Sequence, residues 1–249
     1  MNPDLLCVVL VAARNPLNIG AAARAMSNFG FSRLRVVNPY SVAFRQAKSA
    51  VGASAVLADA EEFTSVAEAV ADCNLVVGTT ALRKREPNHP LRRLDRGALL
   101  IRKQLVAGRV ALLFGSEKFG LSNQDLSHCQ WLLHIPTREE HLSMNLGQSV
   151  AVCLYELRRG VPLKNAKPAA RANGTAHTRP ANSEMLERIT DVLLAALRES
   201  GYVKPGLTDS PQEKARRLVR RLDLTAGDAA VWMGMLRQIL WSMEHPKGH

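Results

Sequence analysis

The sequence predicts an α/β fold with a mostly parallel sheet. Short, continuous apolar runs rich in Val and Leu are typical of strands buried on both faces, and they occur at residues 7–11, 34–37, 75–78, 110–114 and 132–135. Helix-like segments lie between them, at residues 22–29, 63–71, 94–106 and 121–129. Strands that alternate with helices indicate a parallel sheet.

The first predicted strand leads into an unusual turn. Residues 14–31 read RNPLNIGAAARAMSNFGF. A strand, a turn and a helix often bind a nucleotide, but the glycine-rich G-x-G-x-x-G fingerprint is missing. Its absence argues against a doubly wound nucleotide-binding enzyme.

The second half of the chain predicts a helical extension. Asn145 and Gln148 are placed as the N-cap and N3 residues of a helix that stops at Gly160. Pro, Ala, Asn and Gly then dominate, which predicts a linker. Ser210-Pro211-Gln212-Glu213 reads as a further helix start. We therefore divide the chain into a domain at 1–160, a linker at 161–183 and a helical extension at 184–249.

The composition favours a polyanionic partner. The 249 residues include 33 Lys and Arg against 22 Asp and Glu, a net charge of 33 − 22 = +11. Nucleic acid is one explanation for this charge and solubility is the other. Four scattered cysteines without a C-x-x-C pair indicate buried free thiols in a reducing compartment. Without a leader or a run of membrane-spanning length, we expect a cytoplasmic protein.

Three polar segments follow predicted strands. They read N-x-G-x-x-x-R at 18–24, L-F-G-x-E-x-x-G-L at 113–121, and I-P-x-x-x-x-x-L-S-M-N-L at 135–146. The loops that leave the C-terminal ends of parallel strands gather at one rim, where ligands bind. We therefore expect these distant segments to converge.

These three motifs, in this order, resemble those of the SPOUT superfamily of RNA 2′-O-ribose methyltransferases, specifically its TrmH family. The stretch 5–160 is similar to the TrmJ-like branch, which modifies the tRNA anticodon loop. The resemblance implies a deep trefoil knot at the C-terminal end of the sheet, although knots are nearly absent from other folds. It also implies a homodimer and S-adenosyl-L-methionine bound by the knot loops. The implied cofactor-binding residues are Thr79, Thr80, Ala81, Gly115, Ile135, Leu142, Ser143 and Met144.

The resemblance also implies catalytic roles for Arg24, Asn18, Glu117 and Ser143. Arg24 would be the catalytic arginine, either as a general base or as a clamp on the adjacent phosphate, and its high pKa favours the clamp. Glu117 would hold Arg24 in a fork. Read alone, Asn18 is an ordinary N-cap, Ser143 a helix cap, and Arg24 and Glu117 are solvated surface charges.

Two basic clusters are candidates for RNA phosphate contacts rather than merely solvated charges. They comprise Arg83, Lys84, Arg85, Arg92 and Arg93, and then Arg216, Arg217 and Arg220. The histidines have no matching carboxylate or cysteine arrangement, so we predict no metal site. The sequence thus indicates a tRNA 2′-O-methyltransferase, with a ribosomal RNA substrate or a non-catalytic RNA-binding protein as alternatives.

Overall fold

The computed structural model describes residues 2–49, 55–81, 89–159, 179–203 and 211–245. These residues form a seven-stranded sheet in the order β3-β2-β1-β6-β4-β7-β5, and all neighbouring strands are parallel. The strands are β1 (Leu6–Val11), β2 (Arg33–Val37), β3 (Glu61–Phe63), β4 (Leu75–Thr79), β5 (Leu91–Arg93), β6 (Val110–Phe114) and β7 (Trp131–His134). The predicted α/β class with a parallel sheet is therefore confirmed, while the knot remains an implication of the resemblance.

The five strands predicted from apolar runs are all present, with ends that differ by one residue at most. Two strands were missed. All residues of β5 are exposed at the edge of the sheet, and β3 is mostly exposed as well. Edge strands of this kind carry no apolar run, so the sequence has no signal for them.

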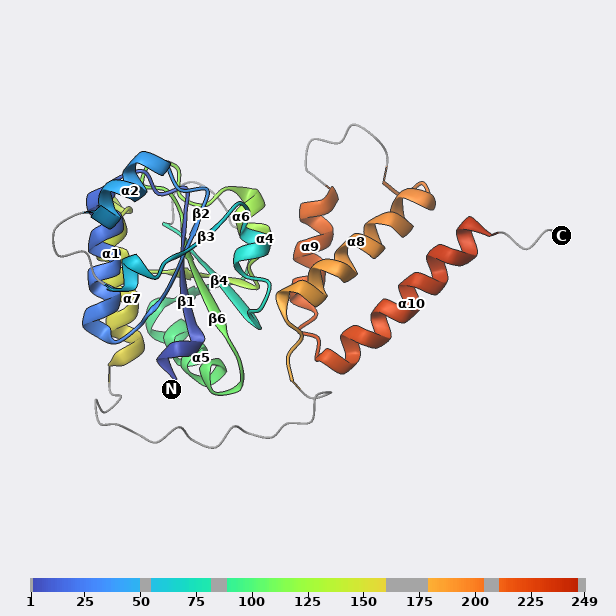
Figure 1. The fold of residues 1–249 in the computed structure, drawn as a ribbon. Coiled ribbons are helices and arrows are strands. Elements are labelled where there is room, and N and C mark those ends of the chain that lie inside the picture. The colour runs from blue at the N-terminus through green and yellow to red at the C-terminus, as the bar shows by residue number, and fades with distance from the viewer. Residues whose placement is uncertain (1, 50–54, 82–88, 160–178, 204–210, 246–249) are drawn as a thin grey trace.

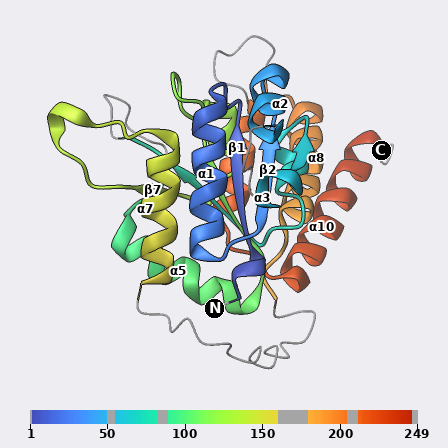
Figure 2. The same cartoon turned by 60° about the vertical axis from the view of Figure 1, so that its left-hand side comes forward.

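Helices cover both faces of the sheet (Figures 1 and 2). One face is covered by α1 (Pro16–Phe29), α5 (Leu94–Ala107) and α7 (Leu146–Arg158), with α2 (Ser41–Ser49) and α3 (Ala55–Ala58) beside α1. The other face packs against α4 (Val66–Ala69) and α6 (Asn123–Ser127). Two short 3₁₀ turns complete this domain, η1 (Pro3–Leu5) and η2 (Glu139–His141).

Helix α1 begins earlier than predicted. Asn15 is its N-cap, because the Asn15 side chain accepts a hydrogen bond from the Leu17 N–H at 2.9 Å, and Pro16 occupies the first helical position. The interpretation of Asn18 as the N-cap was therefore wrong. A Cβ on Gly147 would lie 2.6 Å from the Ala21 Cβ, so α1 and α7 are in close contact. The run of alanines thus serves helix packing.

The extension consists of α8 (Ser183–Glu199), α9 (Pro211–Arg221) and α10 (Ala226–Glu244), which share an apolar cluster of their own. Figure 1 shows α8 and α9 beside α4 and α6. The Ser183 N–H donates to the Cys73 carbonyl at 2.9 Å, and the Asn74 side chain donates to the Pro180 carbonyl at 2.9 Å. The extension is thus docked on the sheet domain. Most of the predicted linker and the predicted cap Ser210 lie outside the described residues.

Candidate active site

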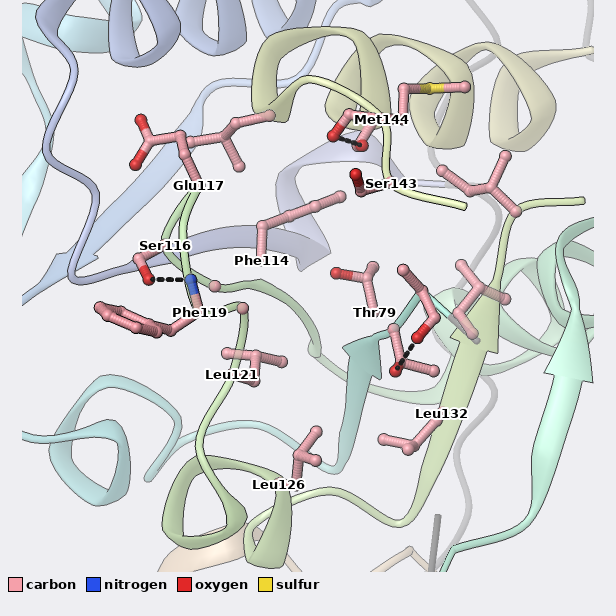
Figure 3. A pocket seen from close by; sticks show the side chains of 18 of the residues that line it. Thr79, Phe114, Ser116, Glu117, Phe119, Leu121, Leu126, Leu132, Ser143 and Met144 are labelled. Atoms are coloured by element: carbon pink, nitrogen blue, oxygen red, sulfur yellow. Dashed lines mark hydrogen bonds between the residues drawn. The ribbon is translucent and has the colours of Figure 1, made fainter. Parts of the chain in front are cut away.

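The three motif segments converge at the C-terminal rim of the sheet. The segments at 113–121 and 135–146 line a pocket of about 680 Å³, together with the end of β4 (Figure 3). The segment at 18–24 lies beside this pocket, because Asn18 is hydrogen-bonded to Glu117 of its lining. All eight residues that we expected to bind the cofactor belong to its lining, namely Thr79, Thr80, Ala81, Gly115, Ile135, Leu142, Ser143 and Met144. The expected convergence is therefore confirmed, while cofactor binding by these residues remains a prediction.

The pocket has an apolar body and a few polar groups. Figure 3 shows Phe114, Leu121 and Leu132 around its interior, with Thr79 and Ser143 among them. The Thr79 hydroxyl donates to the Leu113 carbonyl at 2.8 Å, which fixes the orientation of that side chain. Apolar walls with a few oriented polar groups are typical of small-molecule sites.

The loop after β6 is closed tightly on itself. A Cβ on Gly115 would lie 2.0 Å from the backbone carbon of Gly120, so only glycine fits at position 115. Gly120 has a φ of 69°, and its N–H donates to the Ser116 carbonyl at 2.8 Å. The Phe119 N–H donates to the Ser116 hydroxyl at 3.3 Å. These contacts shape the pocket wall before any ligand arrives.

A network of hydrogen bonds connects the three motifs at the rim. The Asn18 Nδ2 group donates to Glu117 Oε1 at 3.0 Å, and the Asn145 Nδ2 group donates to Asn18 Oδ1 at 2.8 Å. Asn145 also caps α7 through its Oδ1 atom, as the sequence predicted. Both ends of the Asn18 amide are therefore held, and its side chain has a single orientation.

Glu117 also binds the backbone of the first motif. Its carboxylate accepts hydrogen bonds from the N–H groups of Arg14 and Asn15, at 3.3 and 3.2 Å. Partial burial acts to raise the pKa of Glu117, but the hydrogen bonds from Asn18 and the backbone outweigh it, and the pKa is lowered. Glu117 is therefore a carboxylate at neutral pH.

Arg24 does not form the expected fork with Glu117. Arg24 is exposed on α1, and among the described residues it has no ion pair and no place in the pocket lining. Glu117 binds Asn18 instead, because Asn18 lies in the first turn of α1, beside the loop that carries Glu117. The expectation of an Arg24–Glu117 pair within one chain is corrected accordingly.

The basic clusters divide into exposed and buried members. Arg92 and Arg93 are exposed on β5, and Arg92 stacks over the Trp131 ring at 5.6 Å. Arg83, Lys84 and Arg85 lie outside the described residues. Arg92 and Arg93 therefore remain candidates for phosphate contacts.

The prediction for Arg216 and Arg220 was wrong. Arg216 binds Glu187 at 2.6 Å and donates to the Ser127 hydroxyl at 2.9 Å, while Arg220 donates to the Ser183 hydroxyl at 2.7 Å. Both guanidinium groups are buried, so they cannot reach a phosphate. They connect α9 to α8 within the extension, and they connect α9 to α6 of the sheet domain.

Several pocket residues were missed by sequence reasoning. Two of them are polar and come from outside the motifs and the predicted strands, namely His89, which precedes β5, and Ser149 of α7. Arg217 lines it as well, although it was predicted only as an RNA contact. Neither His89 nor Ser149 belongs to a motif, so the sequence alone has no signal for them.

Other groups in the described residues have simpler roles. All four cysteines are free and buried, as predicted. No helix in the described part of the chain is long and apolar enough to span a membrane. No three His, Cys, Asp or Glu side chains gather there in a way that could hold a metal ion.

Comparison with known proteins gives the family. The profile of the SpoU rRNA Methylase family matches residues 5–155. The tRNA (cytidine/uridine/adenosine-2′-O-)-methyltransferase TrmJ of Pseudomonas aeruginosa is 34% identical over 95% of this chain and 93% of its own. The TrmJ protein of Sodalis glossinidius is 34% identical over 96% of this chain and 91% of its own.

Solved structures agree with this relationship. The crystal structure of TrmJ from Z. mobilis ZM4 has a TM-score of 0.77 and 32% identity, and the match covers 94% of this chain and 98% of that one. The match includes the region of the helical extension. The family profile covers all three motifs, and the relatives cover nearly the whole chain. This chain therefore belongs to the SpoU methylase family, in its TrmJ-like branch.

Proposed function

We propose that the protein transfers a methyl group from S-adenosyl-L-methionine to a ribose 2′-hydroxyl in the anticodon loop of tRNA. Its relatives are tRNA 2′-O-methyltransferases over nearly its full length. The observation that carries the proposal is the Glu117–Asn18–Asn145 network at the mouth of the pocket. It joins the three motifs into one site, which a protein without catalytic activity would not need.

The pocket fits the proposed cofactor. Its volume of about 680 Å³ lies within the range of small-molecule sites. The side chains of Leu132, Ile135 and Leu142 offer apolar surface for a purine ring, and the Thr79 and Ser143 hydroxyls offer polar contacts. S-adenosyl-L-methionine, when bound, supplies a sulfonium-activated methyl group.

The main contribution of the protein to the reaction is to hold the reacting groups in position. The Asn18 amide is held by Glu117 on one side and Asn145 on the other, so the start of α1 is fixed against the pocket loops. Holding reactants in line removes much of the entropic barrier to a displacement. We assign Arg24 to the RNA side of the reaction, because it is exposed on the helix that this network anchors. There it clamps a phosphate and stabilises charge that develops on the 2′-oxygen.

Arg92 and Arg93 supply further phosphate contacts in this proposal. Both are exposed on β5, next to β7 at the edge of the sheet, and β7 leads into the pocket residue Ile135. Their contribution is electrostatic and independent of RNA sequence. It agrees with the net charge of +11.

The proposed active form is a homodimer in the cytoplasm. One face of α1 supports it: Leu17 is 80% exposed, Ala21 and Arg24 are exposed, and an added Cβ on Gly20 would meet nothing within 4 Å. An exposed leucine beside small residues offers close contact to a second copy of the chain.

The alternative substrate is ribosomal RNA, because the SpoU rRNA Methylase family is named for that substrate. The test incubates the protein with labelled S-adenosyl-L-methionine and separate pools of tRNA and ribosomal RNA, and then maps the labelled ribose. We expect label in the tRNA anticodon loop. We also expect Arg24→Ala to abolish transfer while the affinity for S-adenosylhomocysteine stays unchanged. Label only in ribosomal RNA, or in neither pool, would overturn the proposal.

A further inference from the structure

Helix α9 carries arginines on two different faces. Arg216 and Arg220 point into the contact with α8 and α6, whereas Arg217 lines the pocket. Among the described residues of the lining, Arg217 alone comes from the extension. The extension therefore forms part of the pocket wall.

The Arg217 charge is poorly balanced by the protein. Its side chain is 11% exposed, and its ion pair with Glu213 spans 3.8 Å, close to the limit for such a contact. The neighbouring Arg216 binds Glu187 at 2.6 Å. A mostly buried charge is costly without a close partner, so an anionic group in the pocket would stabilise Arg217.

A second group with an unmet requirement lies beside Arg217. The Nε2 atom of His89 is buried and has no hydrogen-bond partner among the described residues. Burial first, and then the charges of Arg217 and Arg221, lower the pKa of His89 to about 4, so the ring is neutral at pH 7. The Leu126 backbone acts in the opposite direction and favours the protonated ring, but it is outweighed. A neutral imidazole has one N–H group and one lone pair, so in the tautomer with the proton on Nδ1 the Nε2 atom is an acceptor.

This end of the pocket therefore offers one cation and one acceptor. The guanidinium of Arg217 complements a carboxylate, and the Nε2 lone pair of His89 complements an ammonium group. An α-amino acid carries both groups on the same carbon atom. We propose that Arg217 and His89 form a subsite for the amino-acid end of the cofactor, so that the extension takes part directly in cofactor binding.

This inference rests on the proposed cofactor but goes beyond it, since it gives the extension a role in the pocket. An RNA phosphate is the other anion that Arg217 could bind. A phosphate would satisfy Arg217, but it has no donor for the lone pair of His89. The pair of groups therefore favours the amino acid.

The experiment compares two ligands that differ only at this end. S-adenosylhomocysteine carries the amino-acid group, and 5′-methylthioadenosine is the same thioether nucleoside without it. Both are titrated calorimetrically into the full-length protein and into the Arg217→Gln and His89→Leu variants. Arg237→Gln is the control, because Arg237 is exposed on α10 and does not line the pocket.

We expect Arg217→Gln to lower the affinity for S-adenosylhomocysteine about tenfold or more, which is the effect of losing a hydrogen bond to a charged group. Binding of 5′-methylthioadenosine should stay within about twofold, since that ligand has no charged end. His89→Leu should act in the same direction, and Arg237→Gln should change neither affinity.

Several results would overturn the inference. Equal losses for both ligands would mean that Arg217 only supports the pocket, and no loss for either would mean that it contacts no ligand there. Weaker tRNA binding with unchanged S-adenosylhomocysteine affinity would assign Arg217 to a phosphate. If the unmodified protein bound neither ligand, the proposed cofactor itself would fail. If the unmodified protein bound both ligands and the ratio of the two affinities stayed the same in the variants, this inference alone would fail.

Discussion

One carboxylate joins two helices of the extension where they meet the sheet domain. Glu187 of α8 binds Arg216 at 2.6 Å and lies 3.5 Å from Arg220, and the two arginine side chains are only 7% and 1% exposed. His128 approaches Glu187 at 3.9 Å, but burial and then the two arginines lower its pKa to about 3. His128 is therefore neutral, and among the described residues Glu187 is the carboxylate that forms ion pairs with both buried cations.

Replacing Glu187 with Gln should destabilise the protein strongly. Removing one partner from a buried ion pair costs about 3–5 kcal/mol, because the other charge stays buried without compensation. Glutamine keeps an acceptor oxygen for Arg216, so we expect a loss near the lower end, about 3 kcal/mol. Glu184→Gln is the matched control: Glu184 pairs with Arg188 one turn away on α8, with side chains 52% and 66% exposed. That change should cost less than about 1 kcal/mol.

The measurement is equilibrium unfolding in urea, with the free energy of unfolding taken by linear extrapolation. It should be repeated across pH. Burial acts to raise the pKa of Glu187, but the hydrogen bond and charge of Arg216 prevail and lower it. The stabilisation is therefore complete above the unfolded pKa of about 4.3 and is lost as the pH falls below it. The difference between wild type and Glu187→Gln should shrink in that acid range. Equal, small losses for both variants would refute the reasoning.

Three further predictions concern the rim and the exposed cations. Gly115→Ala should lower both the melting temperature and the affinity for S-adenosylhomocysteine, since its Cβ would meet backbone at 2.0 Å. Gly234→Ala is the control: its Cβ would meet nothing within 4 Å, so it should stabilise α10 by about 1 kcal/mol in thermal unfolding. Asn18→Ala should slow methyl transfer to tRNA about 100-fold through misplacement, with S-adenosylhomocysteine affinity nearly unchanged; full activity would contradict the positioning role. Joint replacement of Arg92 and Arg93 by Gln should reduce the log–log salt slope of tRNA affinity by about 1.4–1.8, and an unchanged slope would remove them from the RNA surface.

The sequence by itself determined the buried strands and the rim. The five apolar runs predicted five strands with nearly correct ends, because a strand buried on both faces needs apolar side chains along its whole length. The motifs that contain Asn18, Glu117 and Ser143 each follow one of these strands. Parallel strands end at the same edge, so the convergence of the motifs followed from the fold class alone.

Only the tertiary structure decided which side chains meet. Glu117 binds Asn18 rather than Arg24, because the first turn of α1 lies at the rim and Arg24 faces outward further along the helix. Adjacent arginines of α9 have opposite roles for a similar reason: Arg216 is buried against Glu187, and Arg217 lines the pocket. Successive residues of a helix point about 100° apart, and the packing of that helix against α6 and α8 determines which direction is the interior. That orientation depends on contacts between segments far apart in the chain, which local sequence patterns do not record.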